Sequence, residues 1–242
     1  MSYFSKFASI AAITMFFSAC GGGDGDSTQP GPVADPNMTV PFKVAYINLI
    51  NNPLNASFKV SGWVDQSSIA NPRPPTPIAG NATLTVSSAT AATINGTSYL
   101  QQNSSLSMAL NGQAPQYSLS QSFYNINDYS IYKTVAGNKT MYYSNFSVPV
   151  SVKAGDVGLL ATATDGSSFL PTTQRLSYSV ASGDITSLRV TVVTDEYSMG
   201  NLSRKTQVVY KVKTDGGINI ISEAYFHYNS GTLYQSLELN AV

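Results

Sequence analysis

The chain contains a single histidine, His227, on which any acid–base catalysis of the serine-hydrolase kind would have to be built. A triad needs a nucleophilic serine, a histidine and an acid in hydrogen-bonding order. No Gly-x-Ser-x-Gly turn is present to carry such a serine. A zinc site would need two or three further nitrogen or sulfur ligands beside His227. The histidine is therefore expected to be an ordinary surface residue.

Acidic side chains are sparse, and many of them fall in expected turns: Asp156, Asp165, Asp184 and Asp215. An Asp in a turn accepts hydrogen bonds from nearby backbone N–H groups, whereas glycoside hydrolysis needs two acids across a cleft. The adjacent pair Asp195 and Glu196 supplies too few oxygens for calcium, which takes about six to eight. We expect no catalytic residue, no metal site and no cofactor, and hence a protein that is not an enzyme.

Tyrosines are abundant, at 15, and they cluster along the chain. The clusters are Tyr117 to Tyr132, Tyr142-Tyr143, and Tyr225, Tyr228 and Tyr234. Exposed tyrosines stack on sugars or anchor protein contacts, but β-sheets also use them in cross-strand packing. Packing is the expected role, and a protein or glycan at the cell surface stays open as a partner.

The first twenty residues have the features of an export signal. Lys6 precedes an apolar stretch from Phe7 to Phe17, too short for a membrane-spanning helix, which needs about 20 apolar residues. The stretch ends in Phe17-Ser18-Ala19-Cys20, which resembles the lipobox of bacterial lipoproteins. The resemblance implies a signal peptide over residues 1–19 and a lipidated Cys20 as the new N-terminus. An ordinary secretory signal is the alternative.

Residues 20–39 are expected to form the lipidated cysteine and a flexible linker. Gly21 to Pro36 is glycine, acid and proline with almost nothing to bury. Such a spacer holds a folded domain off a membrane, to which acyl chains bind at about 0.8 kcal/mol per buried methylene. Because Gly21 and not Asp follows Cys20, the resemblance to enteric lipoproteins favours the outer membrane. The expected location is the cell envelope, lipid-anchored in the outer membrane.

Charge excludes one class of partner. Lys plus Arg is 13 and Asp plus Glu is 13, so the formal net charge is zero. Such a chain offers no basic footprint for a polyanion, and we expect no nucleic acid partner. The single cysteine cannot form an intrachain disulfide, so the mature fold must be stabilised by its hydrophobic core.

From Val40 onward, apolar and polar side chains alternate as in antiparallel strands with one buried face. The apolar sets are Phe58, Val60 and Val64; Phe146, Val148, Val150 and Val152; Leu176, Tyr178 and Val180; and Leu188, Val190 and Val192. Turn sequences that tolerate positive φ separate them: Asn95-Gly96, Asn111-Gly112, Asp165-Gly166 and Asp215-Gly216-Gly217.

The C-terminal part predicts a three-stranded meander. Val208, Tyr210 and Val212 form the buried face of its first strand, and Leu233, Leu237 and Leu239 belong to its last. In the middle strand, Ile218, Ile220, Ala224, Phe226 and Tyr228 are expected on the buried face. Because strand side chains alternate, Glu223, Tyr225 and His227 are then expected on the solvent-exposed face.

The stretch from Asn125 to Gly166 resembles an uncharacterised family of bacterial immunoglobulin-like domains. The resemblance rests on turn chemistry and alternation: Asp128-Tyr129, Ala136-Gly137, Val150 to Val152, Ala154-Gly155-Asp156 and Leu159 to Gly166. The family opens with a strand ending in Asn, for which Val44 to Asn48 is the candidate. The resemblance implies an antiparallel immunoglobulin-like β-sandwich, and it implies no activity and no site residues.

The predicted organisation is a β-sandwich domain over residues 40–184 and a β-meander over residues 185–242, which belongs to the same or a second sandwich. The first functional hypothesis is a non-catalytic module for adhesion, envelope structure or surface assembly. The alternatives are an exported hydrolase of polysaccharide or peptide, and a small-ligand binder for an outer-membrane transporter. A cleft with convergent acids would favour the hydrolase, and a closed apolar cavity would favour the ligand binder.

Replacing Cys20 tests the expected anchor. Cys20→Ser removes the thiol that would receive the acyl chains, so the variant should move from the detergent phase to the soluble envelope fraction. Mass spectrometry of the wild-type N-terminal peptide should show the acyl mass. An unmodified peptide, or unchanged partitioning of the variant, would contradict the expected lipoprotein.

Overall fold

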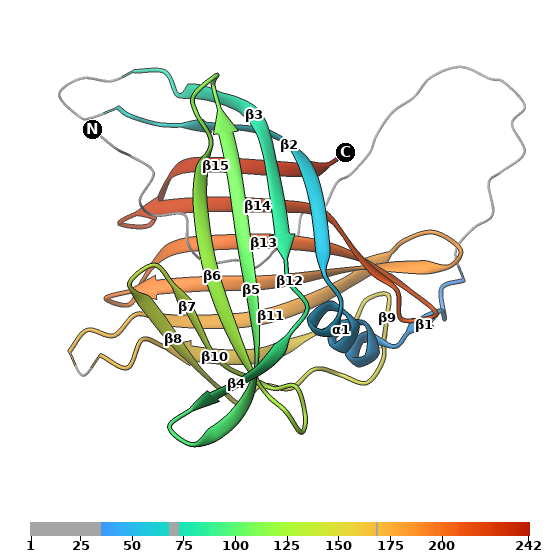
Figure 1. Cartoon of the computed structure of the whole chain (residues 1–242). Coiled ribbons are helices and arrows are strands. Elements are labelled where there is room, and N and C mark those ends of the chain that lie inside the picture. The colour runs from blue at the N-terminus through green and yellow to red at the C-terminus, as the bar shows by residue number, and fades with distance from the viewer. Residues whose placement is uncertain (1–34, 68–72, 168) are drawn as a thin grey trace, which may run out of the picture.

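The computed structural model describes residues 35–67, 73–167 and 169–242 (Figure 1). The expected signal peptide, Cys20 and most of the linker lie outside the described residues. The helix is α1 (Phe42–Asn51). The strands are β1 (Thr39–Val40), β2 (Leu54–Val64), β3 (Thr76–Val86), β4 (Thr90–Ile94), β5 (Thr97–Leu110), β6 (Gln116–Asn125), β7 (Ile131–Ala136), β8 (Lys139–Ser144), β9 (Val152–Lys153), β10 (Val157–Thr164), β11 (Thr173–Ser182), β12 (Ser187–Ser198), β13 (Asn201–Lys213), β14 (Ile218–Asn229) and β15 (Thr232–Ala241).

Twelve antiparallel strands close into a barrel, so the predicted immunoglobulin-like sandwich is wrong. The order around the wall is β3-β2-β15-β14-β13-β12-β11-β10-β8-β7-β6-β5, and β5 pairs back onto β3. In β5, residues 104–110 pair with β3, while residues 97–101 pair with β4, which extends beyond the wall. Alternation with one buried face is common to sandwiches and barrels. The closing pair β3–β5 decides between them.

The C-terminal region completes this barrel. Strands β13, β14 and β15 form the expected meander, and β12 joins it to β11. The last strand, β15, pairs along seven residues with β2, near the start of the described chain. Residues 185–242 therefore belong to the same sheet as the strands before them.

The two surfaces of the wall differ in polarity. Inward side chains form two apolar clusters, one around Phe58, Leu84 and Leu237 and the other around Leu188, Val190 and Val212. On β2 and β3 the exposed outward side chains are polar: Asn55, Ser57, Lys59 and Ser61 on β2 and Asn81, Thr83 and Thr85 on β3. Among the described residues, no helix has the length and apolar character to cross a bilayer.

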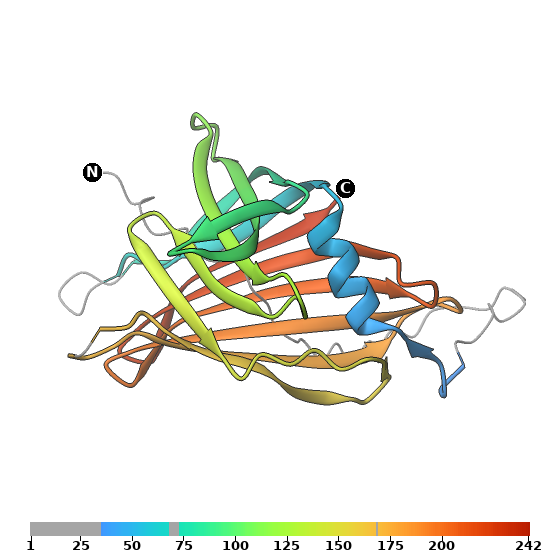
Figure 2. The same ribbon diagram turned by 60° about the horizontal axis from the view of Figure 1, so that its bottom comes forward.

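Helix α1 closes one end of the barrel, and the strand expected over Val44 to Asn48 is wrong. Pro41 precedes its first turn, where a proline costs no hydrogen bond. Phe42, Ala45 and Ile50 share the buried face, at a spacing that suits a helix. Figure 2 shows α1 lying across the barrel opening. We call this the helix end and the opposite opening the far end.

Hydrogen bonds fix α1 to three parts of the wall. Gln102 Nε2 of β5 donates to the carbonyl oxygens of Leu49 at 2.9 Å and Ile50 at 3.1 Å. Asn48 Nδ2 donates to the carbonyl oxygen of Gly216, in the β13–β14 turn, at 3.0 Å. Tyr46 Oη donates to the carbonyl oxygen of Tyr129, in the β6–β7 loop, at 3.0 Å. These hydrogen bonds hold the helix in place across the helix end of the barrel.

The expected faces of β14 are wrong beyond Ile220. Tyr210 of β13 pairs with Ile220 and Val209 with Ser222, so Ile221 is an extra residue in a β-bulge. The extra residue reverses the alternation that follows it. Glu223, Tyr225 and His227 therefore face the interior and are buried, whereas Phe226 is only half-buried. The predicted turns, in contrast, are confirmed, with positive φ at Asn95 (50°) and Asn111 (49°).

Gly62, on β2, lies where two backbones approach too closely for a side chain. A Cβ atom added there would overlap the carbonyl oxygen of Ser236 on β15. We expect Gly62→Ala to cost about 1–3 kcal/mol, as overpacked sites do, because β15 must move away from β2. Ser61→Ala, on the exposed outer face, is the control and should change stability by less than about 0.5 kcal/mol. Urea melts measure both, and equal costs would contradict the close approach of the strands.

Candidate functional site

The barrel encloses two adjoining spaces. A cavity of about 200 Å³ lies at the helix end. A pocket of about 360 Å³ lies toward the far end. Ala136, at the end of β7, lines both of them. We call them the helix-end cavity and the far-end pocket.

The helix-end cavity is mostly apolar. Phe42, Tyr46 and Leu49 of α1 form one side. Strand residues complete the apolar wall: Leu54, Leu84, Val86, Ile131, Leu160, Leu176, Val192, Ile218 and Ile220. A polar strip runs along β5 and β6, made by Gln102, Ser104, Ser120 and Ser122. The cavity thus offers hydrocarbon contact on most sides and hydrogen bonding on one.

Buried tyrosine hydroxyls complete the polar side of the cavity. Tyr124 Oη donates to Gln102 Oε1 at 3.1 Å, while Gln102 Nε2 holds the end of α1. Burial raises the pKa of Tyr124 to about 12, and it also raises the pKa values of Tyr46, Tyr143 and Tyr210. These hydroxyls stay protonated at neutral pH, so the lining of the helix-end cavity presents neutral donors and acceptors.

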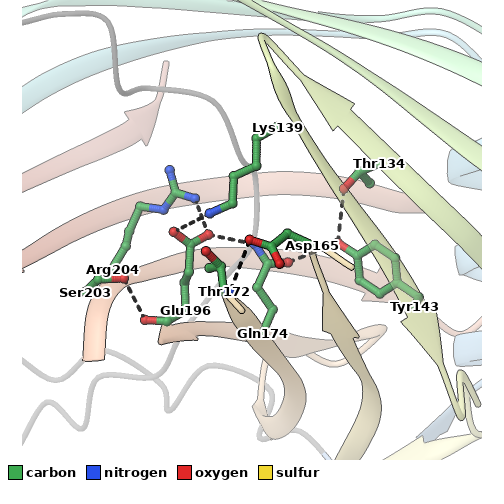
Figure 3. A network of polar contacts seen from close by, with 9 residues as sticks. All are labelled: Thr134, Lys139, Tyr143, Asp165, Thr172, Gln174, Glu196, Ser203 and Arg204. Atoms are coloured by element: carbon green, nitrogen blue, oxygen red, sulfur yellow. Dashed lines mark hydrogen bonds and ion pairs between the residues drawn. The ribbon is translucent and has the colours of Figure 1, made fainter. Parts of the chain in front are cut away.

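A charged network centred on Glu196 lies in the far-end pocket (Figure 3). Lys139 Nζ lies 2.9 Å from Glu196 Oε1, and an Arg204 guanidinium nitrogen lies 2.6 Å from Oε2. Gln174 Nε2 also donates to Oε2, at 2.8 Å. Burial by itself raises the pKa of Glu196, but the charges of Arg204 and Lys139 outweigh it and hold that pKa below its ordinary value. Glu196 is thus a charged carboxylate with both oxygens bound.

The network reaches the wall of the helix-end cavity. Tyr143 Oη donates to Gln174 Oε1 at 3.3 Å, and it lies 3.4 Å from the hydroxyl of Thr134. Tyr143 and Thr134 both line the helix-end cavity. A chain of polar contacts therefore runs from the apolar space to the ion pairs of the far-end pocket (Figure 3).

Sequence reasoning weighed Glu196 only together with Asp195, as an incomplete calcium site. The two residues point to opposite faces of β12, since Asp195 pairs with Lys205 on the outside at 3.4 Å. The missed signal is the alternation itself. Leu188, Val190 and Val192 face inward, and continuing at the same spacing reaches Glu196. An acidic residue at the same spacing as the buried apolar residues of a strand is predicted to point into the barrel, as Glu196 does.

Glu223, Tyr225 and His227 form a second polar group along β14. Tyr225 Oη donates to Glu223 Oε2 at 2.6 Å, while Glu223 Oε1 has no hydrogen-bond partner among the described residues. Burial raises the pKa of Glu223 to about 7, and the hydrogen bond from Tyr225 opposes it. His227 lies on the wall of the far-end pocket, with its ring 6.1 Å from that of Tyr234.

The tyrosines divide between the inside and the outside of the barrel. Tyr46, Tyr124, Tyr143 and Tyr210 line the helix-end cavity. Outside the wall, Tyr99 stacks on Tyr132 at 4.8 Å between ring centroids, and Tyr132 meets Tyr142 edge-on at 6.0 Å. Packing thus accounts for most of them, whereas Tyr117 is exposed. Within the described ranges, no three His, Cys, Asp or Glu side chains group as metal ligands would.

Comparisons of the chain with protein-family models, with curated proteins and with solved structures found no match. The geometry of the two interior spaces therefore carries the functional argument.

Glu223 should make stability fall as pH rises. Its folded pKa of about 7 exceeds the ordinary value of 4.5, so neutral Glu223 stabilises the fold fully below pH 4.5, and this contribution is lost as pH rises through about 7. A shift of this size corresponds to up to about 3 kcal/mol. Glu223→Gln, which stays neutral, should match the wild type near pH 4.5 and exceed its free energy of unfolding at pH 8.

Urea melts across that pH range measure the difference. Glu238→Gln, at a partly exposed position on the neighbouring β15, is the matched control and should leave the pH dependence unchanged. A wild-type curve that Glu223→Gln does not alter would contradict the raised pKa.

Proposed function

We propose that this protein is a non-catalytic binder of a small, largely apolar ligand, held at the bacterial outer membrane by a lipidated Cys20. The observation that carries the proposal is the helix-end cavity, about 200 Å³ of mostly apolar space inside a closed wall. Among the functions that the sequence leaves open, a mostly apolar cavity inside the barrel favours the ligand binder over adhesion and over hydrolysis.

The size of the space suits a small ligand. Protein interiors are packed with few voids larger than a water molecule. An engineered apolar cavity of about 150 Å³ binds benzene, and the helix-end cavity is of similar size, at about 200 Å³.

The lining sets the chemistry of the ligand. Leucine, isoleucine and valine side chains favour hydrocarbon, while Gln102 and the serines of β5 and β6 face the same space. The tyrosine hydroxyls in the wall stay neutral because burial raises their pKa values. A ligand with a hydrocarbon body and at least one hydrogen-bonding group suits this lining.

The outer surface of the barrel is consistent with a lipid tether at Cys20. A closed barrel is compatible with an outer-membrane location. Membrane-embedded barrels carry an apolar band on the outside, but here polar side chains cover the outer faces of β2 and β3. The polar outer faces of these two strands favour a barrel held beside the membrane, as a lipidated cysteine and a linker would hold it.

A cavity-filling variant tests the proposal. N-phenyl-1-naphthylamine, an uncharged apolar fluorophore, should bind the wild type saturably at one site. Ser120→Phe places a ring in the helix-end cavity and should weaken binding at least about tenfold. Leu119→Phe is the matched control, because Leu119 is the adjacent residue of β6 and is exposed on the outer face. It should bind like the wild type.

Fluorescence titration measures the affinity, and circular dichroism shows that each variant is folded. Binding that Ser120→Phe and Leu119→Phe affect equally, or a folded wild type without saturable binding, would contradict a ligand in the helix-end cavity.

A further inference from the structure

The far-end pocket holds more basic than acidic groups at its centre. Among the described residues of its lining, Lys139 and Arg204 are cations and Glu196 is the one carboxylate. Both cations contact Glu196, one at each oxygen. Glu196 and Arg204 are nine-tenths buried in this site, so solvent and salt screen the charges there less than on the surface.

Lys139 is the member of this group that can receive another anion. An ammonium group has three donors, and among the described residues Lys139 is paired with one carboxylate oxygen, at 2.9 Å. Its side chain is 28% exposed, against 10% for Glu196. Lys139 thus faces the pocket with N–H donors that can bind a further anion.

Asp165 is the other acid near Lys139, and its oxygens are engaged elsewhere. They accept hydrogen bonds from the backbone N–H groups of Ser167 at 3.0 Å and Thr172 at 3.1 Å. Asp165 is partly exposed, so solvent and salt screen its charge. It reduces the positive potential at Lys139 without occupying the pocket.

The position of the pocket links this charge to the helix-end cavity. Ala136 lines both spaces, and Lys139 follows three residues later, across the β7–β8 turn. Tyr143, in the cavity wall, contacts Gln174, which in turn binds Glu196. The two spaces therefore share a boundary at Ala136, close in sequence to Lys139.

We infer that the ligand is an acidic amphiphile, whose hydrocarbon part fills the helix-end cavity and whose carboxylate or phosphate group binds Lys139 in the far-end pocket. This inference rests on the proposed function and names the class of its ligand. Hydrogen bonds between an ammonium and an anionic oxygen are among the strong ones in proteins. The neutral cavity lining supplies no such charge.

Competition against N-phenyl-1-naphthylamine tests the inference with three probes that share a ten-carbon chain: decanoate, decyl phosphate and decanol. The wild type should bind at least one of the two acids about tenfold more tightly than decanol. The better acid then identifies the head group. Lys139→Gln should remove this preference, so that the variant binds the acids and decanol about equally.

Lys205→Gln is the matched control. Lys205 also pairs with an acid, Asp195, and its side chain is 29% exposed, but it lies on the outside of the barrel. It should retain the preference for the acid. Glu196→Gln should tighten binding of the acid, because it removes the carboxylate that competes for Lys139. A merely structural ion pair would not produce that gain.

The outcomes separate the two proposals. Saturable binding of the fluorophore and of decanol without preference for either acid overturns the inference and leaves the proposed function standing. Equal behaviour of Lys139→Gln and Lys205→Gln also overturns it. If the folded wild type binds neither the fluorophore nor any of the three probes, both the inference and the proposed function are overturned.

Discussion

The backbone hydrogen bonds between β3 and β5 are the interaction on which the interior depends. Without them, the thirteen-stranded sheet would be an open, twisted sheet with two free edges. With them, the inward faces of twelve strands surround one volume, and α1 closes that volume at the helix end. β5 is long enough to pair with β4 along one half and with β3 along the other. The cavity and the pocket both follow from this closure.

Within that volume, the two buried glutamates respond to burial in opposite ways. Glu196 is surrounded by Lys139, Arg204 and Gln174, so it remains charged despite its desolvation. Among the described residues, the hydroxyl of Tyr225 is the hydrogen-bond partner of Glu223, and burial raises the pKa of Glu223 to about 7. Burial of a charge is costly unless partners compensate for it. The distribution of charged partners therefore divides the barrel into an ionic far end and a neutral apolar interior.

Local pattern predicted β2, β11, β12 and several turns, because these depend on neighbours in sequence. It did not predict β3, β5 or β6, and the run from Phe146 to Val152 is a strand only at Val152. The alternation of Leu188, Val190 and Val192 and the positive φ of Asn95 needed no tertiary information. The barrel could not be predicted in this way, since closure joins β3 to β5 and β2 to β15 without any change in alternation. The inward orientation of His227 was missed because one extra residue, Ile221, shifts the register of β14. Such a bulge depends on the neighbouring strands as much as on local sequence.

The pairing of β15 with β2 has a consequence for how the molecule is made. Residues 58–64 find their partners in residues 235–241, far later in the sequence. The chain is synthesised from its N-terminus, so β2 has no neighbour on that side until residues 235–241 have been made. Pairings so distant in sequence carry a large loop-closure entropy and slow folding. Until those residues are made and paired, the unpaired edge of β2 is a site for aggregation.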